Sequence, residues 1–276
     1  MADLLFKIAE YADQNLEFVT ATVVESEKST PRKSGARMLV HKDGSIEGTI
    51  GGGVLEHTVI KDALELLPSG DNCLKVYDIG TGNPVNEGEK LPAICGGWFR
   101  IYLEVFRKKN TVFLFGGGHV ARKLTRIMDV LGYSYCVVDN RIEFLSPEDF
   151  PKARELFHCP YDQLDTLPID EHSMCVVMTH GHIHDAECVE QLLKTPARYI
   201  GMIGSMSKVK KNLLKIHSHG VKIDDRVYSP IGLSLSGNEP AQVALSVAAE
   251  LTAVLAGKKE ILFFREKFRK RFKNDE

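Results

Sequence analysis

The chain has 276 residues, of which 43% are hydrophobic and 26% charged, and its formal net charge at pH 7 is -2. This balance is typical of a soluble globular protein and excludes a disordered or fibrous chain, and the length suits two domains of ordinary size. A charge so close to zero gives no overall attraction to nucleic acid or to anionic membranes, so the function must reside in local sites.

The start of the chain and its cysteines predict a cytoplasmic protein. Residues 1–18 alternate charged and apolar side chains at helical spacing, which predicts a first helix rather than a signal peptide. The six cysteines are scattered without a Cys-x-x-Cys pair, as expected for free thiols in a reducing compartment. No apolar run reaches the roughly 18 to 20 residues that a membrane span requires.

The first half of the sequence begins as a mixture of strands and helices. Residues 18–26 alternate as a strand does, and residues 37–50 read as a hairpin with its turn at 42–45. A glycine triplet, Gly51-Gly52-Gly53, then precedes an apolar pattern over residues 54–67 that fits a helix. Glycines at the start of a helix leave backbone N–H groups exposed, so the triplet has the geometry of an anion-binding site.

The segment over residues 78–98 is rich in glycine and proline and has no periodicity. A long irregular loop inside a compact domain is usually functional or disordered. It closes on Cys95-Gly96-Gly97, where the glycines would let a ligand or a neighbouring backbone approach the thiol. The alternative is a buried cysteine beside a tight turn, because free cysteines are among the most buried residues.

A basic, polar stretch at residues 104–111 predicts a boundary between an N-terminal domain, residues 1–108, and a C-terminal domain, residues 109–276. The second half alternates short apolar runs with helical patterns. Such alternation predicts a doubly wound parallel sheet covered by helices on both faces, a Rossmann-like α/β fold.

The first of these runs leads into Gly116-Gly117-Gly118-His119-Val120-Ala121, which matches G-x-G-x-x-A between a predicted strand and a predicted helix. In this context the glycines allow a tight turn and a close approach to a pyrophosphate. Asp139 ends the next strand, where an acid would bind ribose hydroxyls. The pattern predicts NAD(P) or another nucleotide, but a fold alone supplies no hydride-transfer chemistry.

A second candidate site is "VVMTHGHIHD", residues 176–185. If the extended conformation continued past the strand, His180, His182 and His184 would share one face and could hold zinc. A turn at Gly181 would break that alternation and leave the imidazoles to make hydrogen bonds. Asp185 is a helix cap or a further ligand.

A third candidate site lies in "RYIGMIGSMSKVKKN", residues 198–212. Gly201 and Gly204 flank the end of the predicted strand, Ser205 and Ser207 are suitable N-cap residues, and lysines occupy the first turns of the predicted helix. These features suit a phosphate at the helix N-terminus. Ordinary capping with a solvated basic face explains them equally.

Eight blocks in order resemble the motifs of the XdhC/CoxI family of xanthine dehydrogenase accessory proteins, over residues 19–256: "ATVVESEKSTPRKSGARMLV", "GTIGGGVLE", "ICGGW", "FLFGGGHVARKL", "VVDNR", "VVMTHGHIHD", "YIGMIGSMSK" and "SPIGLSLSG". The resemblance implies an N-terminal α/β domain joined to a Rossmann-like domain. It also implies a chaperone that binds molybdenum cofactor (molybdopterin), protects it during sulfuration and delivers it to a xanthine dehydrogenase-type apoenzyme. A cysteine desulfurase is the implied sulfur source, and we expect a homodimer.

The resemblance also assigns roles to individual residues. Cys95 is the expected contact to molybdenum or sulfur, because a thiolate is a soft ligand, and the buried-thiol interpretation stays open beside it. Arg32 suits a phosphate through its fork of donors. His184 stands at a position that the family leaves variable, which weakens a three-histidine zinc site. The residues predicted to bind the cofactor are Arg32, Gly51, Gly52, Gly53, Glu56, Cys95, Gly96, Gly97, Gly116, Gly118, His119, Asp139, His180, His182, Asp185, Gly204 and Ser205.

Two positions depart from the family's pattern. Many members carry a cysteine where this chain has Val54, so a two-thiol mechanism in that block is not expected. Lys28 replaces a common glycine. The function that the resemblance predicts is that of a cofactor chaperone with no catalytic residue. The alternatives are an NAD(P)-dependent oxidoreductase that uses the Gly116 to Asp139 site and a nucleotide-sensing module.

Overall fold

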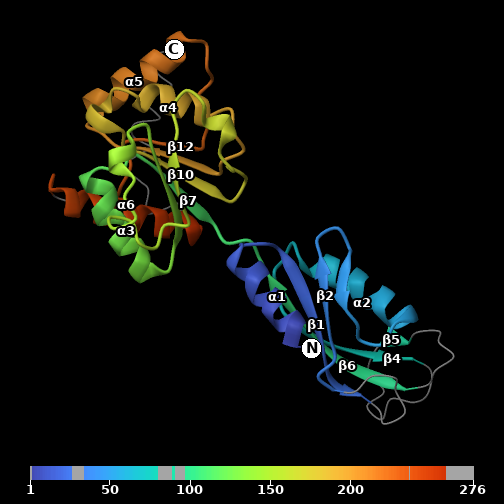
Figure 1. The fold of residues 1–276 in the computed structure, drawn as a ribbon. Helices are drawn as coiled ribbons and strands as arrows, with labels where there is room; N and C mark the ends of the chain where they lie inside the picture. Colours follow the sequence, from blue (N-terminus) through green and yellow to red (C-terminus); the bar gives the residue numbers. More distant parts are fainter. Residues whose placement is uncertain (1, 27–33, 80–88, 91–96, 236, 259–276) are drawn as a thin grey trace. The chain divides into compact units, whose positions relative to one another are not determined.

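The computed structural model describes residues 2–26, 34–79, 89–90, 97–235 and 237–258. The chain divides into two compact units, Met1–Lys109 and Asn110–Glu276 (Figure 1). That these units act as separate domains, with the boundary expected after residue 108, stays a prediction. Arg32, Cys95 and Gly96 lie outside the described residues. Within the described residues, every helix is too short or too polar to cross a lipid bilayer.

Where the structure describes the first unit, it shows one mixed sheet and two helices. Its strand order is β3-β2-β1-β6-β4-β5, and every pairing is antiparallel except that of β4 with β5. The elements are α1 (Ala2–Asp13), β1 (Phe18–Ser26), β2 (Arg37–His41), β3 (Ile46–Gly48), α2 (Gly53–Leu66), β4 (Cys73–Asp78), β5 (Glu89–Lys90) and β6 (Trp98–Phe106).

Period-two alternation along β1 builds the core of this unit. Val19, Ala21 and Val23 are buried on the face that packs against α2, which contributes Leu55 and Val59. The intervening residues of β1 turn to the other face, where the ring of Phe18 meets Tyr11 of α1. The alternation predicted for residues 18–26 thus positions the sheet between two helices.

Glu47 on β3 ties α1 to the sheet. Its carboxylate accepts from Lys7 Nζ at 2.5 Å and from the Tyr11 hydroxyl at 2.7 Å, and it lies 3.1 Å from Nε2 of His41. Hydrogen bonds from Lys7 and Tyr11 lower the pKa of Glu47 to about 2, although burial opposes this change. A carboxylate with a depressed pKa stabilises the fold above its unfolded pKa of about 4.3 and loses that contribution as the pH falls toward 2.

We therefore expect Glu47→Gln to lower the free energy of unfolding by about 1 kcal/mol at pH 7, the upper range for a solvent-screened ion pair. The difference between variant and wild type should vanish near pH 2. The single tryptophan, Trp98, lies on β6 of the same unit, so its fluorescence during denaturant unfolding reports the transition. Glu10→Gln, at an exposed position of α1, is the control. Equal destabilisation at both pH values would contradict the assignment.

The described residues of the second unit form a fully parallel six-stranded sheet and four α-helices. Its strand order is β12-β11-β10-β7-β8-β9. Taken from β9, this is the order 3-2-1-4-5-6 of the doubly wound Rossmann fold, which confirms the predicted fold class. The elements are β7 (Thr111–Phe115), α3 (His119–Leu131), β8 (Ser134–Asp139), β9 (Glu155–His158), β10 (Ser173–Val177), α4 (Asp185–Leu192), β11 (Tyr199–Met202), α5 (Met206–Ser218), β12 (Val227–Tyr228) and α6 (Pro240–Leu255).

Both faces of this sheet are covered. Phe113 and Phe115 of β7 point to the core shared with α4 and α5, whereas Val112 and Leu114 point to the core shared with α3 and α6. Figure 1 shows the two helix pairs on opposite sides of the strands. Strands buried on both faces read as continuous apolar runs, which is why the sequence shows no polar alternation there.

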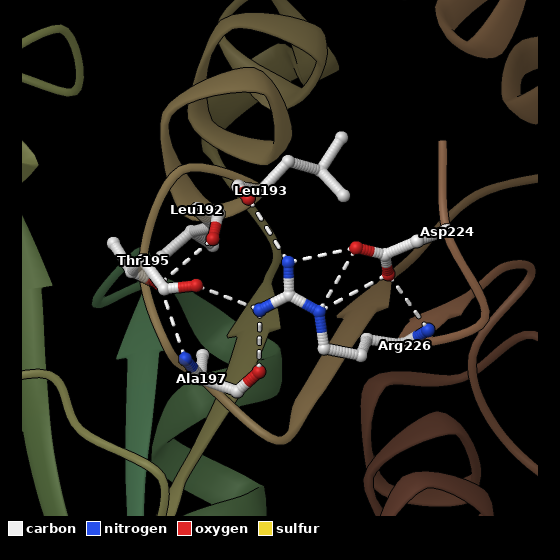
Figure 2. Close-up of polar contacts among 6 residues, drawn as sticks. All are labelled: Leu192, Leu193, Thr195, Ala197, Asp224 and Arg226. Atoms are coloured by element: carbon white, nitrogen blue, oxygen red, sulfur yellow. Dashed lines mark hydrogen bonds and ion pairs between the residues drawn. The ribbon is translucent and has the colours of Figure 1, made fainter. Parts of the chain in front are cut away.

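Arg226, just before β12, fastens the end of α4 to the sheet (Figure 2). Its guanidinium donates to the carbonyl oxygens of Thr195 and Ala197 at 2.7 and 2.8 Å and to that of Leu193 at 2.9 Å. Nε and Nη2 also pair with Asp224. The last carbonyls of a helix have no partner within it, so one arginine here satisfies the end of α4 and the turn into β11.

Adjacent strands β7 and β10 send their connections to opposite faces of the sheet. The chain leaves β7 for α3 on one face and leaves β10 for α4 on the other. Open α/β sheets bind ligands outside the carboxyl ends of their strands at such a switch point. The predicted glycine turn and histidine segment both begin there.

Candidate functional site

The three glycines after β7 have different surroundings. A Cβ atom at Gly116, which has a φ of 118°, would lie 2.4 Å from the Met178 carbonyl oxygen. One at Gly117 would lie 2.3 Å from the carbonyl oxygen of Phe144. At Gly118 nothing lies within 4 Å. Gly116 and Gly117 are thus required for packing, and only Gly118 opens onto unfilled space.

Gly118 is the N-cap residue of α3 and provides no side-chain cap, and His119 is the first residue of the helix. The first N–H groups of an α-helix have no partner within it and carry the positive end of the helix dipole. An uncapped N-terminus beside an open glycine has the properties that bind a phosphate. The predicted strand–glycine–helix turn is therefore present at Gly118, and its binding of a phosphate stays a prediction.

Asp139, at the end of β8, is completely buried. Its carboxylate accepts from the N–H of Gly117 at 2.8 Å, from the N–H of Arg141 at 3.0 Å, and from Nε and Nη2 of Arg141 at 3.0 Å each. In this arrangement Asp139 joins two loops to each other. Ribose binding by Asp139 stays a prediction that requires the carboxylate to leave these partners.

The segment after β10 forms a short 3-10 turn over His180–His182, in which Gly181 and His182 both have a φ of 62°. The turn at Gly181 is as predicted, and the extended alternation that would align three histidines is wrong. His184 instead pairs with Glu187 at 2.9 Å. Among the residues that the structure describes, no group of three His, Cys, Asp or Glu side chains is placed to hold a metal ion.

Asp185 organises this turn from the first position of α4, where it is completely buried. It accepts from the N–H and the hydroxyl of Thr179 at 3.1 and 2.6 Å and lies 2.7 Å from Nδ1 of His182. It thus acts on the preceding loop rather than as the N-cap, a position that His184 occupies. Nδ1 of His182 is thus engaged by Asp185, and Nε2 is the ring nitrogen that remains.

His182 holds a backbone conformation that is unusual for a residue with a side chain. Such strain costs on the order of 1–3 kcal/mol and persists where the surroundings fix it, often at functional sites. Here Asp185 and Gly181 supply that restraint. His182 is therefore held in a defined orientation by a buried partner, whereas His184 pairs with the partly exposed Glu187 and His180 is exposed.

The loop after β11 shows ordinary helix capping. Ser205 is the N-cap of α5, and its hydroxyl accepts from the N–H of Lys208 at 3.4 Å. Gly204, with a φ of 149°, makes the turn that precedes the cap. The capping interpretation of Ser205 is confirmed, and a phosphate at this position stays a prediction.

At the start of the predicted anion site in the first unit, the chain's own Glu56 carboxylate accepts from the backbone. Glu56 accepts from the Thr49 hydroxyl at 2.6 Å and from the N–H groups of Ile50 and Gly51 at 2.9 and 3.2 Å. Partial burial opposes ionisation, but these hydrogen bonds keep the pKa of Glu56 below its usual value. Gly52 and Gly53 lead into α2 with open space at their Cβ positions.

The predicted thiol site lies mostly outside the described residues. Of the Cys-Gly-Gly block only Gly97 is described, and its carbonyl oxygen accepts from the N–H of Ile79 at 2.8 Å. Elsewhere, burial raises the pKa of Cys136 to about 11 and raises that of Cys73, Cys175 and Cys188 as well. A raised pKa disfavours the thiolate form of these four cysteines.

Residues that the sequence did not single out complete the site. Arg141 and Phe144 close over the glycine turn, and Thr179 shares Asp185 with His182. The guanidinium carbon of Arg141 lies 3.7 Å from the centre of the Phe144 ring. The sequence signal was the short spacing from Asp139 to Arg141, which allows a carboxylate and a guanidinium to meet across one turn.

Comparisons with known families match both parts of the chain. Residues 112–251 match the model of the XdhC Rossmann domain, and residues 11–78 match that of the XdhC and CoxI family. These two ranges contain the glycine turn, the histidine segment and the Gly51 to Glu56 block.

Three relatives are similar over most of this chain. YqeB, an uncharacterized protein of Escherichia coli K12, is 31% identical over 91% of this chain, which spans 46% of the length of YqeB. A probable subunit of a xanthine dehydrogenase from Bacillus subtilis is 24% identical over 85% of this chain and 92% of its own length. PaoD of E. coli K12, a molybdenum cofactor insertion chaperone, is 23% identical over 86% of this chain and 83% of its own length.

A crystal structure described as that of a xanthine dehydrogenase from Bacillus halodurans has a similar fold. It is 22% identical in sequence, with a TM-score of 0.51 over 91% of this chain and 96% of that chain. At this identity the likeness supports the fold class and nothing about activity.

Proposed function

This chain belongs to the XdhC and CoxI family, and we propose that it binds molybdenum cofactor, protects it during sulfuration and delivers it to a xanthine dehydrogenase-type apoenzyme. The family match supports the proposal, as does the likeness to an insertion chaperone for this cofactor and to a component of a xanthine dehydrogenase. A cysteine desulfurase as sulfur source and a homodimer in a cytoplasmic setting belong to the same proposal.

The observation that carries the proposal is the open N-terminus of α3 at the switch point of the sheet. Molybdopterin ends in a phosphate monoester, and the N–H groups beyond Gly118 lack a side-chain cap. Gly118 leaves room for the phosphate oxygens to approach the backbone. The described residues therefore fit the phosphate end of the cofactor.

His182 suits the other end of such a ligand. A pterin ring presents both hydrogen-bond donors and acceptors, and Nε2 of His182 is the ring nitrogen that remains once Nδ1 has paired with Asp185. Because Asp185 is buried and fixes the ring, Nε2 is oriented before the ligand arrives. Gly204 and Ser205 follow the neighbouring strand β11 and belong to the same proposed site.

Molybdenum is cargo in this proposal, and its protein contact is Cys95. A thiolate is a soft ligand that matches molybdenum–sulfur chemistry. The raised pKa of Cys73, Cys136, Cys175 and Cys188 argues against those thiols as the contact. Hydride transfer to or from a nicotinamide has no comparable support, since the Rossmann order alone hosts many chemistries.

We expect the full chain, purified in the presence of molybdopterin, to contain stoichiometric pterin and molybdenum. Gly118→Val should lower the bound pterin about tenfold or more, because a hydrogen bond to a charged group contributes about 1.5–3 kcal/mol and each 1.4 kcal/mol is tenfold. The valine enters open space, so the fold should be preserved. Cys95→Ala should release molybdenum, whereas its control Cys73→Ala should not.

The two variants also divide the work between the units. We expect pterin loss in Gly118→Val and molybdenum loss in Cys95→Ala. Loss of pterin in Cys95→Ala but not in Gly118→Val would contradict the role proposed for Gly118. Failure of the folded wild-type chain to bind either pterin or molybdenum would refute the proposed function.

A further inference from the structure

Asp139 lies at the position where the acidic residue of a dinucleotide-binding fold binds the ribose hydroxyls. All acceptor positions of its carboxylate are already occupied by hydrogen bonds. An ionised carboxylate has about four acceptor positions, two on each oxygen. Oδ1 accepts from N–H and Nε of Arg141, and Oδ2 accepts from N–H of Gly117 and Nη2 of Arg141. Because the side chain is also fully buried, no acceptor position is left for a sugar hydroxyl.

Neighbouring groups hold Arg141 in place against Asp139. The guanidinium of Arg141 lies against the ring of Phe144, with its carbon 3.7 Å from the ring centre. The carbonyl oxygen of Phe144 packs against Gly117 so tightly that a Cβ there would lie 2.3 Å away. The loop that carries Arg141 is thus seated on the glycine turn itself, while Gly118 next to it stays open.

We propose that Arg141 is a specificity-determining residue that closes the diol-reading position of the glycine turn. The turn then accepts a phosphate-bearing ligand without a ribose diol and rejects nucleotides that need Asp139 for their ribose. This inference rests on the proposed function, in which the turn binds a phosphate monoester. Molybdopterin meets this condition because it carries a phosphate but no ribose.

The geometry predicts what removal of the guanidinium does. Arg141→Ala frees the Nε position on Oδ1 and the Nη2 position on Oδ2, while the backbone N–H groups of Gly117 and residue 141 stay bonded. One acceptor on each oxygen is the arrangement that a vicinal diol requires. The variant should therefore acquire affinity for an ordinary ribonucleotide.

Calorimetric titration of the full chain with ADP and with 2′-deoxy-ADP tests this. The two ligands carry the same phosphates and differ by one ribose hydroxyl. We expect the wild-type chain to show no preference for ADP and Arg141→Ala to prefer it by about tenfold, since a hydroxyl bonded to a carboxylate contributes roughly 1.5 kcal/mol or more. Arg126→Ala, which removes the same charge at an exposed position of α3, should behave as wild type.

Arg141→Lys keeps the ion pair with Asp139 but not the fork, so it should fold and should shift the preference in the same direction by a smaller factor. The proposal is overturned if the wild type prefers ADP and Asp139→Asn abolishes that preference. It is also overturned if both folded Arg141 variants show no gain. If the wild-type chain does not bind pterin, the proposed function is refuted. The titrations with ADP and 2′-deoxy-ADP still test the role of Arg141 in that case.

Discussion

Arg226→Ala is expected to lower the free energy of unfolding of the second unit by about 3 kcal/mol. Truncation removes donors from the carbonyl oxygens of Leu193, Thr195 and Ala197 and leaves Asp224 without its cation (Figure 2). A lost buried hydrogen bond costs about 1–3 kcal/mol, and solvent reaching this partly exposed arginine restores part of that sum. Burial raises the pKa of Asp224, but the pairing with Arg226 outweighs this and lowers the pKa below its ordinary value. In Arg226→Ala the pKa of Asp224 should therefore rise toward its ordinary value.

The measurement separates the two units. Far-UV circular dichroism during denaturant unfolding follows both, while fluorescence of Trp98 follows the first unit only. Arg226→Ala should lower the denaturant midpoint of the second unit, which circular dichroism detects, and leave the midpoint of Trp98 fluorescence unchanged. Arg226→Lys should recover a small part of the stability, because an ammonium cannot reach three carbonyl groups in one plane.

Arg198→Ala is the matched control for Arg226→Ala. The guanidinium of Arg198 makes one exposed hydrogen bond, to Asn110 at 2.8 Å, so its loss should change the free energy of unfolding by less than about 0.5 kcal/mol. If Arg226→Ala behaved like this control, the end of α4 would not depend on the network in Figure 2.

The strands of the second unit could be predicted because their signals are local. Both β7 and β10 are buried along their whole length and appear as uninterrupted apolar runs. The pairing of β1 with β6 could not be predicted, since Phe18 lies opposite Phe106 and no local pattern records so distant a partner. The sheet order of the first unit is therefore a finding of the structure.

The candidate site was predictable to the level of the backbone but not of side-chain pairing. The glycine turn follows from strand, glycine and helix signals in sequence. The saturation of Asp139 depends on a 3-10 turn that places Arg141 beside it, and short-range propensity does not specify that turn. The histidine alternation failed for the same reason, because Gly181 and His182 both adopt positive φ.

The two predicted anion sites are alike in their local hydrogen bonding. Neither Gly52 nor Gly118 provides a side-chain cap for the helix that follows it. In each case a carboxylate accepts from the N–H of the preceding glycine, Glu56 from Gly51 and Asp139 from Gly117. Gly118 is the better candidate in the proposed function because it lies at the switch point of the parallel sheet, where open α/β folds bind ligands.

Gly117→Ala and Gly118→Ala test whether these neighbouring glycines have different roles, Gly117 in packing and Gly118 in ligand binding. Alanine at Gly117 would bring its Cβ within 2.3 Å of a backbone carbonyl oxygen, which no side-chain rotation can relieve. Overpacking of this kind costs about 1–3 kcal/mol, and we expect the upper end because the nearest atom, the carbonyl oxygen of Phe144, belongs to the backbone. Alanine at Gly118 meets open space and should cost less than about 1 kcal/mol, the usual penalty for a poorer N-cap.

Pterin binding and stability should respond differently to these two substitutions. Gly118→Ala keeps the fold but narrows the phosphate approach, so pterin binding should fall while the unfolding transition of the second unit stays near that of wild type. Gly117→Ala forces the Phe144 carbonyl away and with it the loop that seats Arg141 on Asp139. Equal effects of the two variants on stability would show that Phe144 does not pack on the turn as described. If they differ, only Gly118 reports on the ligand, because only its Cβ position faces the space that the phosphate would use.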